Sequence, residues 1–341
     1  MKRNWKHILT RIDNTYPDSE FLSAVLSACR DWAASGEGFG PTSAITGDGA
    51  VGVAEKMFSE AHGSRPAILV PSATYGLYGL LKAFGVKDGT KVCCPCYDWP
   101  AAYAAIKAAG GTPVLVSVDP ETLTLDPAAL KDIDMSEVSA VIVTHIHGTA
   151  ADVSAIRSAV PPGIPIIEDC SQAVFSSIDG KLCGTLGDAA VFSFGPSKAL
   201  YAGEGGMVLL RDWDLYEKTL CETAHPVRQR VGGVCGEVKA DGFSVRPHPL
   251  TPILLVAALK AFDAGARHKA FEKTASGLSA LSGVKLIGVD NRRCNASGRV
   301  PAILPAAADG LIEGYDCVCS GAFDLHHMSK PDKNIVLVNE K

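Results

Sequence analysis

The stretch that decides the fold is VFSFGPSKAL, residues 191–200 of a 341-residue chain. Its first four residues are typical of a buried apolar strand, and Gly195-Pro196 then breaks the strand with a tight turn. Lys198 follows this turn directly, where burial can lower the pKa of an amine. Schiff-base lysines have this environment. Taken alone, a surface lysine in a loop explains the stretch better, so the rest of the chain has to decide between the two interpretations.

Strand-like and helical segments alternate on both sides of this stretch, from Ala67 to Leu210. Helical spacing is clearest over residues 75–84, 99–109 and 152–160. The strand-like apolar runs cover residues 67–70, 92–94, 113–118, 138–143, 164–167, 189–194 and 207–210. This alternation predicts an α/β fold with a mostly parallel sheet that is flanked by helices on both faces. Such sheets bind ligands at the carboxyl ends of their strands.

We expect three parts in the chain. Residues 1–60 form an N-terminal helical segment that packs on the large domain, residues 61–245 form the large domain, and residues 246–341 form a small C-terminal α/β domain. In the small domain we expect Thr251 to cap a helix that carries Pro252 in its first turn. The strand-like runs of the tail are residues 300–304 and 335–338.

The composition excludes several classes of protein. A net charge of -5 offers no basic surface for nucleic acid, and no apolar run reaches membrane-spanning length. The basic N-terminus is followed by neither a continuous apolar region nor a small-residue cleavage site, so we expect no signal peptide and a cytoplasmic location. The odd number of cysteines, 11, then indicates reduced thiols. Cys93 and Cys96 form a lone C-x-x-C, for which we expect buried thiols and no metal site.

Polar residues fall where several predicted strands end. Residues 72–74 stand between a strand and a helix, where their N–H groups would bind an anion or where Ser72 would simply cap the helix. Asp169 ends an apolar strand, as a cap or as the partner of a buried cation. Trp99 begins a predicted helix, and core packing is its ordinary role.

The order of these segments resembles the DegT-type sugar-nucleotide aminotransferases. The family consists of pyridoxal 5'-phosphate (PLP) enzymes of the aspartate aminotransferase fold, known as fold type I. The resemblance covers roughly residues 35–265 and rests on six segments that occur in the family's order. These segments are the phosphate turn Ser72-Ala73-Thr74, PCYDW at 95–99, HIHGTAAD at 145–152, IEDCSQA at 167–173, GDAAVFSFGPSK at 187–198 and GEGG at 203–206.

The resemblance implies a role for each matching residue. Lys198 would hold PLP as a Schiff base and move protons between the cofactor and the substrate, and Asp169 would pair with the protonated pyridine nitrogen. Trp99 would stack on the open face of the ring, and Gln172 would reach its phenolic oxygen or its face. The cofactor phosphate would be held by Ala73, Thr74 and Ser193, and by Ser244 on a loop that reaches in from the neighbouring subunit.

The sequence also departs from the family's pattern. Ala73 replaces a usual glycine, Asp98 replaces a usual threonine, and Ser244 replaces the asparagine of the cross-subunit loop. We still expect a homodimer. His145 and His147 are expected near the pocket, with at least one of them a satisfied core histidine. The small domain is short, without a recognisable closing substrate segment, and the basic residues of its tail are expected to be solvated surface charges: Arg292, Arg293, Arg299, Lys330 and Lys333.

Three functions follow from this reading. The leading one is transfer of an amino group from an amino acid, with glutamate as the expected donor, to a keto-sugar or keto-cyclitol that is free or nucleotide-linked. The second is a PLP-dependent elimination or other lyase reaction on a small amino substrate, which the atypical tail motivates. The third is a non-catalytic PLP-fold regulatory protein, against which the intact Lys198, Asp169, Gln172 and Trp99 argue. A keto-sugar dehydratase is disfavoured because those relatives carry histidine at the lysine position.

Overall fold

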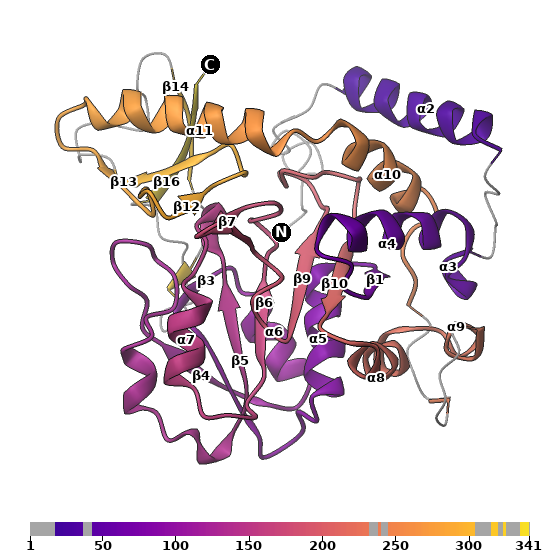
Figure 1. The fold of residues 1–341 in the computed structure, drawn as a ribbon, viewed down its shortest axis with the longest axis horizontal. Helices are drawn as coiled ribbons and strands as arrows, with labels where there is room; N and C mark the ends of the chain where they lie inside the picture. Colours follow the sequence, from indigo (N-terminus) through magenta and orange to yellow (C-terminus); the bar gives the residue numbers. More distant parts are fainter. Residues whose placement is uncertain are drawn as a thin grey trace, which may run out of the picture.

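The computed structural model describes residues 18–36, 43–231, 238–239, 245–303, 315–319, 323–324 and 335–340. Its centre is a seven-stranded sheet in the order β1-β10-β9-β6-β5-β2-β4 (Figure 1). Only β10 runs antiparallel to its neighbours in this sheet, so the predicted mostly parallel sheet is confirmed. The strands are β1 (Ala67–Val70), β2 (Lys91–Pro95), β4 (Thr112–Val116), β5 (Val138–Thr144), β6 (Ile166–Asp169), β9 (Ala189–Ser193) and β10 (Gly206–Leu210).

Both faces of this sheet are buried, which explains why its strands read as nearly continuous apolar runs. Successive side chains of a strand point to opposite faces. In β9, Phe192 packs in one core cluster with Phe58, whereas Val191 packs in a second cluster with Leu77. In β5, Val143 similarly belongs to a third cluster on the face of Phe192, next to the helix that follows β5. The strands therefore separate two helical layers.

The helices cover the two faces unequally. The layer behind the sheet in Figure 1 consists of α5 (Ala73–Ala83), α6 (Ala101–Ala108) and α8 (Trp213–Thr223). The front layer holds α7 (Val153–Ala159), α4 (Gly49–Ala61) and α10 (Thr251–Ala261), and α10 packs on both α4 and α2 (Asp18–Ala34). The remaining helical segments are α3 (Ser43–Thr46), α9 (Pro226–Val231), η1 (Ala129–Asp132), η2 (Met135–Glu137) and η3 (Ile146–Gly148). None of the helices in the described ranges is long and apolar enough to cross a bilayer.

A second, antiparallel sheet forms the smaller unit, in the order β11-β13-β16-β14. Its strands are β11 (Lys285–Leu286), β13 (Val300–Ile303), β14 (Tyr315–Cys319) and β16 (Ile335–Glu340). The helix α11 (Ala264–Ser279) covers this sheet, with Phe271 and Leu278 packed on Val300 (Figure 1). The two strands predicted in the tail are confirmed and pair with each other, whereas α11, β11 and β14 were not predicted.

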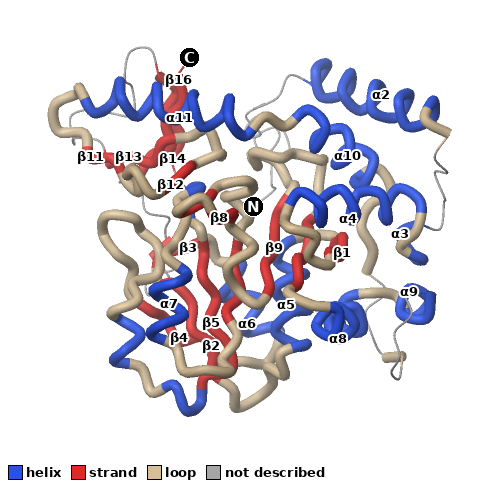
Figure 2. The backbone as a smooth tube through the Cα atoms, viewed as in Figure 1, coloured by secondary structure: helices blue, strands red, loops and turns tan. Residues whose placement is uncertain are grey.

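The smaller unit meets the large sheet at the carboxyl ends of its strands. There β15 (Phe323–Asp324) pairs with β3 (Tyr97–Asp98), which comes directly after β2. Nearby, β12 (Arg293–Cys294) pairs with β7 (Ser177–Ile178), which also pairs with β8 (Lys181–Leu182). Figure 2 shows these short strands embedded in the loops between the two units. The segments that carry the polar strand ends are therefore covered by chain from the C-terminal part.

Two local predictions are wrong. Thr251 does not cap α10, because Leu250 occupies the cap position and the Thr251 hydroxyl donates instead to the carbonyl oxygen of Glu204, 2.8 Å away. That bond ties the helix to the glycine-rich turn at residues 203–206. The helix predicted from Trp99 begins only at Ala101, after Pro100.

Candidate active site

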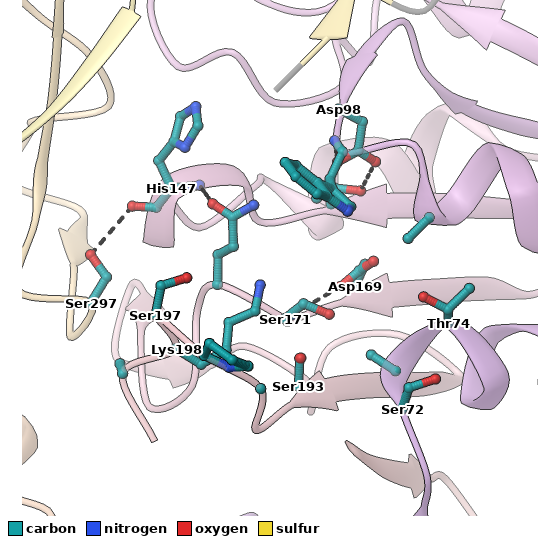
Figure 3. Close-up of a pocket in the computed structure, with 18 of the residues that line it drawn as sticks. Ser72, Thr74, Asp98, His147, Asp169, Ser171, Ser193, Ser197, Lys198 and Ser297 are labelled. Atoms are coloured by element: carbon teal, nitrogen blue, oxygen red, sulfur yellow. Dashed lines mark hydrogen bonds between the residues drawn. The ribbon is translucent and has the colours of Figure 1, made fainter. Parts of the chain in front are cut away.

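Polar side chains surround a cavity of about 540 Å³ at the carboxyl ends of β9, β6 and β5 and the start of α5. Figure 3 shows Asp98, Asp169 and Lys198 around this cavity, with Ser72 and Thr74 at the start of the helix beside it. All predicted site residues within the described ranges line it: Ala73, Thr74, Trp99, Asp169, Gln172, Ser193 and Lys198. Ser244 lies outside the described residues.

The turn after β9 presents Lys198 to the cavity. Phe194 holds the turn by donating its N–H to Gly205 and by accepting a hydrogen bond from Ala202, at 2.9 and 3.0 Å. Ser197 has a φ of 66°, a left-handed conformation that non-glycine residues adopt rarely and that often marks functional sites. Burial lowers the pKa of the Lys198 amine, and the charges of Asp169 and Asp98 oppose this shift. The Lys198 amine therefore loses its proton more easily than the amine of a lysine exposed to water.

Asp169 sits at the end of β6 with only 5% of its surface exposed. One carboxylate oxygen accepts the Ser171 N–H at 2.9 Å, and the Asp169 carbonyl oxygen accepts the His145 N–H at 3.0 Å. These bonds fix the carboxylate at the cavity wall (Figure 3). Asp169 thus caps a turn, as one of the two sequence-based roles predicts, and it also faces the cavity as a buried acid.

The start of α5 points backbone N–H groups and hydroxyls toward the cavity. Ser72 caps the helix, because its hydroxyl oxygen accepts the Tyr75 N–H at 3.2 Å. Ala73 and Thr74 line the cavity, and the first N–H groups of a helix have no partner inside the helix. The hydroxyl-bearing Ser193 reaches the same cavity from β9. N–H groups and hydroxyls at a helix N-terminus suit a phosphate.

Gly206 lets the backbone at the start of α5 come close to β10. A Cβ atom at Gly206 would lie 2.6 Å from the Ala73 amide nitrogen and 2.7 Å from the Phe192 carbonyl oxygen. Both neighbours are backbone, so they cannot rotate away. We expect Gly206→Ala to lower the free energy of unfolding by about 2 kcal/mol, in the usual range for overpacking, when measured by urea unfolding.

Gly265→Ala is the matched control for this prediction. Gly265 lies in α11, has no left-handed φ, and a Cβ there would meet Asp263 at an ordinary 3.4 Å. We expect it to be neutral or to stabilise the protein by up to about 1 kcal/mol, the helix preference of alanine over glycine. Equal stability of both variants would show that the close approach at Gly206 is not a constraint.

Trp99 and Gln172 border the cavity in different ways. Trp99 is 53% exposed, so core packing, its ordinary role, is wrong here. The backbone N–H of Trp99 donates to a carboxylate oxygen of Asp98 at 2.7 Å. The side-chain oxygen of Gln172 accepts the N–H of His147 at 2.9 Å, which supports the left-handed backbone of His147, with a φ of 56°.

The two histidines have different surroundings. As expected, one of them, His145, lies in the core with both ring nitrogens hydrogen-bonded. His145 is fully buried, bonds Glu168 at 2.9 Å through Nε2, and accepts the Ala151 N–H at Nδ1. His147 lines the cavity, and its Nε2 lies 3.3 Å from the Tyr97 hydroxyl. Burial lowers the pKa of His147 to about 4, so its ring is neutral at pH 7.

Three potential metal ligands occur together under β6, and two of them, His145 and Glu168, already use their lone pairs in hydrogen bonds. Ligand atoms of His145, Glu168 and Cys170 lie within 4.8 Å of one another. Besides His145, the Glu168 carboxylate accepts N–H groups at 2.6 to 2.8 Å from Gly184, Leu186 and Gly187. This cluster therefore works as a hydrogen-bonded support under β6.

Several residues that line the cavity were not predicted as site residues: Asp98, Thr144, Ser171, Ser197, Glu204, Ser297 and Arg299. Arg299 was expected to be a solvated surface charge, and its position at the cavity wall corrects that prediction. It arrives with the smaller unit, where Asn295 donates to the His147 carbonyl oxygen at 3.1 Å. No local sequence signal marks such a contact, because nearly 150 residues separate its partners.

Comparison with known proteins identifies related families and structures. The family model described as the DegT/DnrJ/EryC1/StrS aminotransferase family matches residues 45–311. An L-glutamine:2-deoxy-scyllo-inosose aminotransferase of Streptomyces fradiae is 37% identical over 161 residues, which is 47% of this chain and 38% of the relative. A GDP-perosamine synthase of Caulobacter vibrioides is 36% identical over 165 residues, or 48% of this chain and 44% of the relative.

Solved structures extend the similarity over nearly the whole fold. The aminotransferase TlmJ from Streptoalloteichus hindustanus has a TM-score of 0.74 at 26% identity, covering 93% of this chain and 90% of TlmJ. The curated relatives are longer, and the chain spans between 38% and 62% of their lengths. The architecture is therefore shared more fully than the sequence.

Proposed function

This chain belongs to the DegT/DnrJ/EryC1/StrS aminotransferase family, and from that premise we propose that it is a PLP-dependent aminotransferase. It transfers the amino group of an amino acid to a keto-cyclitol or keto-sugar. One observation carries the proposal: a lysine with a lowered amine pKa, a buried carboxylate and a helix N-terminus line one cavity.

The residues of the cavity fit PLP. The start of α5, with Thr74 and Ser193, offers N–H and hydroxyl donors to the phosphate. Asp169 offers a buried carboxylate to the pyridine nitrogen, and the exposed Trp99 ring offers an aromatic face at the cavity mouth. When bound, PLP supplies an electron sink for carbanions that form next to the amino group.

Each side chain then has a task. Lys198 holds the cofactor through its amine, whose lowered pKa favours the nucleophilic form. The same amine would take and return a proton at the reacting carbon of the substrate. Asp169 would keep the proton on the ring nitrogen, and Gln172 orients the loop of His147 at the cavity wall. Ser244, outside the described residues, remains a proposed contact to the phosphate of the neighbouring subunit.

The substrate classes are inferred from relatives. Their names state L-glutamine and 2-deoxy-scyllo-inosose for one protein and a GDP-sugar product for another. We propose that a keto-cyclitol or keto-sugar, free or nucleotide-linked, is the acceptor here. Glutamate and glutamine are both proposed as donors, because the sequence suggested glutamate and the relatives' names suggest glutamine.

The test is a pair of half-reactions, each monitored through the visible absorption band of the bound cofactor. An amino donor should remove this band from PLP-loaded protein. Protein loaded with pyridoxamine phosphate should regain the band with members of a panel of free and nucleotide-linked keto compounds. If no keto compound restores it and an amino acid undergoes elimination instead, the lyase alternative replaces the transaminase.

We propose a homodimer in which each subunit completes the site of the other. The family assembles in this way, and the loop at residues 242–246 is the candidate for the contact, although residues 242–244 lie outside the described part. Sedimentation equilibrium of the PLP-loaded protein should give twice the chain mass. A fully active monomer would refute the proposal and would explain why serine replaces asparagine at position 244.

Two further features of the sequence remain proposals. We propose the division into residues 1–60, 61–245 and 246–341, supported by the separate core cluster of α11 and β13. The packing of α10 on α4 and α2 links the start of the third part to the first. We also propose a cytoplasmic location, supported by the eight free cysteines among the described residues.

A further inference from the structure

Asp98 is a second buried acid that lines the cavity, besides Asp169. It follows β2 in the short strand β3 and is only 2% exposed. Its carboxylate accepts two hydrogen bonds, from the Thr144 hydroxyl at 2.6 Å and from the Trp99 N–H at 2.7 Å. An acid that is buried so deeply and held by two donors has a fixed orientation.

Thr144, which bonds Asp98, lies beside Asp169 in the sheet. The strands β6, β5 and β2 are neighbours in the sheet, and Thr144 at the end of β5 pairs in register with Asp169 at the end of β6. Register partners on neighbouring parallel strands lie about 5 Å apart and point to the same face. The three residues therefore lie next to one another at the carboxyl edge of the sheet. Figure 3 shows the two acids, Asp98 and Asp169, at the cavity.

The charges around Asp98 explain its behaviour. Burial and then the charge of Asp169 raise the pKa of Asp98 to about 8, against the opposing effects of the two hydrogen bonds and of Lys198. In the register of β3 with β15, Phe323 lies opposite Asp98 and Asp324 lies opposite Tyr97. The titratable groups of the described residues that adjoin Asp98 or share its cavity are Asp169, Lys198, His147, Glu204, Arg299 and Cys94.

We propose that Asp98 is a positioning residue for the ring nitrogen of the cofactor, acting through its charge as a second acid beside Asp169, with Thr144 holding its carboxylate. The proposal rests on the proposed binding of PLP. A cation at Asp169 neutralises the charge that disfavours ionised Asp98. Ionised Asp98 in turn adds attraction for that cation, so the two ionisations support each other.

The sign of the pH dependence follows from this coupling. Without a ligand, Asp98 is mostly protonated below pH 8 and ionised above it. A ligand with a protonated ring nitrogen favours ionised Asp98, so its pKa falls on binding. A nearby opposite charge shifts the pKa of a carboxyl group by about one unit or more, and one unit corresponds to about tenfold in affinity. The contribution of Asp98 is therefore small at pH 6 and large at pH 9.

Pyridoxine 5'-phosphate is the probe, because it keeps the ring nitrogen and the phosphate but has no aldehyde to bond Lys198. Its dissociation constant is measured by titration calorimetry for the wild type and for Asp98→Asn, which resembles the protonated acid. We expect nearly equal affinities at pH 6 and a wild-type advantage of about tenfold at pH 9. Thr144→Val removes one hydrogen-bond donor from ionised Asp98. The advantage of this variant over Asp98→Asn should therefore begin at a higher pH than the advantage of the wild type does.

Asp134→Asn is the matched control, since Asp134 is an exposed acid that caps a turn through the Ser136 N–H at 3.0 Å. It should bind the probe as the wild type does at every pH. An affinity ratio between wild type and Asp98→Asn that stays near one from pH 6 to pH 9 would overturn the role of Asp98 while leaving cofactor binding intact. Absence of binding to the wild type at every pH would overturn both the role of Asp98 and the proposed cofactor.

Discussion

Lys198→Ala is expected to fold, to bind PLP only non-covalently, and to lose turnover by about a thousandfold or more. Acid–base catalysis by a positioned side chain contributes up to about ten-thousandfold. No other lysine lines the cavity among the described residues, so no second amine can take over the proton transfer. Initial rates with the best amino donor measure the loss. The visible band of the bound cofactor reports whether the covalent link is gone.

Labelling gives this prediction its control. Borohydride reduction of the PLP-loaded wild type should leave the pyridoxyl group on the peptide that contains Lys198. Lys218 is an exposed lysine that pairs with Asp214 at 2.7 Å, so Lys218→Ala should keep full activity and full labelling. Label on Lys218 or on the exposed Lys181 would show that the turn after β9 does not carry the cofactor.

Asp169→Asn is expected to keep the fold and to bind PLP, but to lose activity by about a hundredfold or more. Asparagine can still accept the Ser171 N–H, so the turn after β6 remains capped. A neutral amide cannot stabilise a protonated pyridine nitrogen, so the cofactor is a weaker electron sink. Losses of this size are usual when one preorganised electrostatic group is removed from an active site.

Asp212→Asn provides a matched control for this variant. Asp212 also caps through a backbone N–H, that of Leu215 at 2.8 Å, but it lies on the surface at the start of α8. Its change to asparagine should leave the rate unaltered. If Asp169→Asn is as active as Asp212→Asn, then Asp169 serves only as a cap.

The sequence predicted most of the large sheet because burial on both faces leaves a simple signal. A strand such as β9 is apolar up to its last residue, Ser193, and a turn with glycine and proline follows it. Lys198 follows this turn and Asp169 ends the apolar strand β6, so these residues at strand ends could be found without a structure. The start of α6 was misplaced because Pro100, rather than Trp99, precedes its first turn.

The rest of the site depends on contacts that are distant in sequence. Arg299 and Ser297 come to the cavity with the smaller unit, and the hydroxyl of Thr251 bonds Glu204 across 47 residues. Asp98 was visible only as a departure from a familiar motif. Its burial and its bond to Thr144 arise from the neighbouring positions of β2 and β5 in the sheet, which the order of the chain does not reveal.

The fate of a labelled amino group tests the proposed transamination most directly. Protein loaded with PLP is incubated with ¹⁵N-labelled glutamine or glutamate and a keto-cyclitol or keto-sugar, and the products are analysed by mass spectrometry. We predict that the label appears in the aminated acceptor, in proportion to the keto acid formed from the donor. Release of the label as ammonia, with no labelled acceptor from any keto compound in the panel, would contradict amino transfer and indicate elimination.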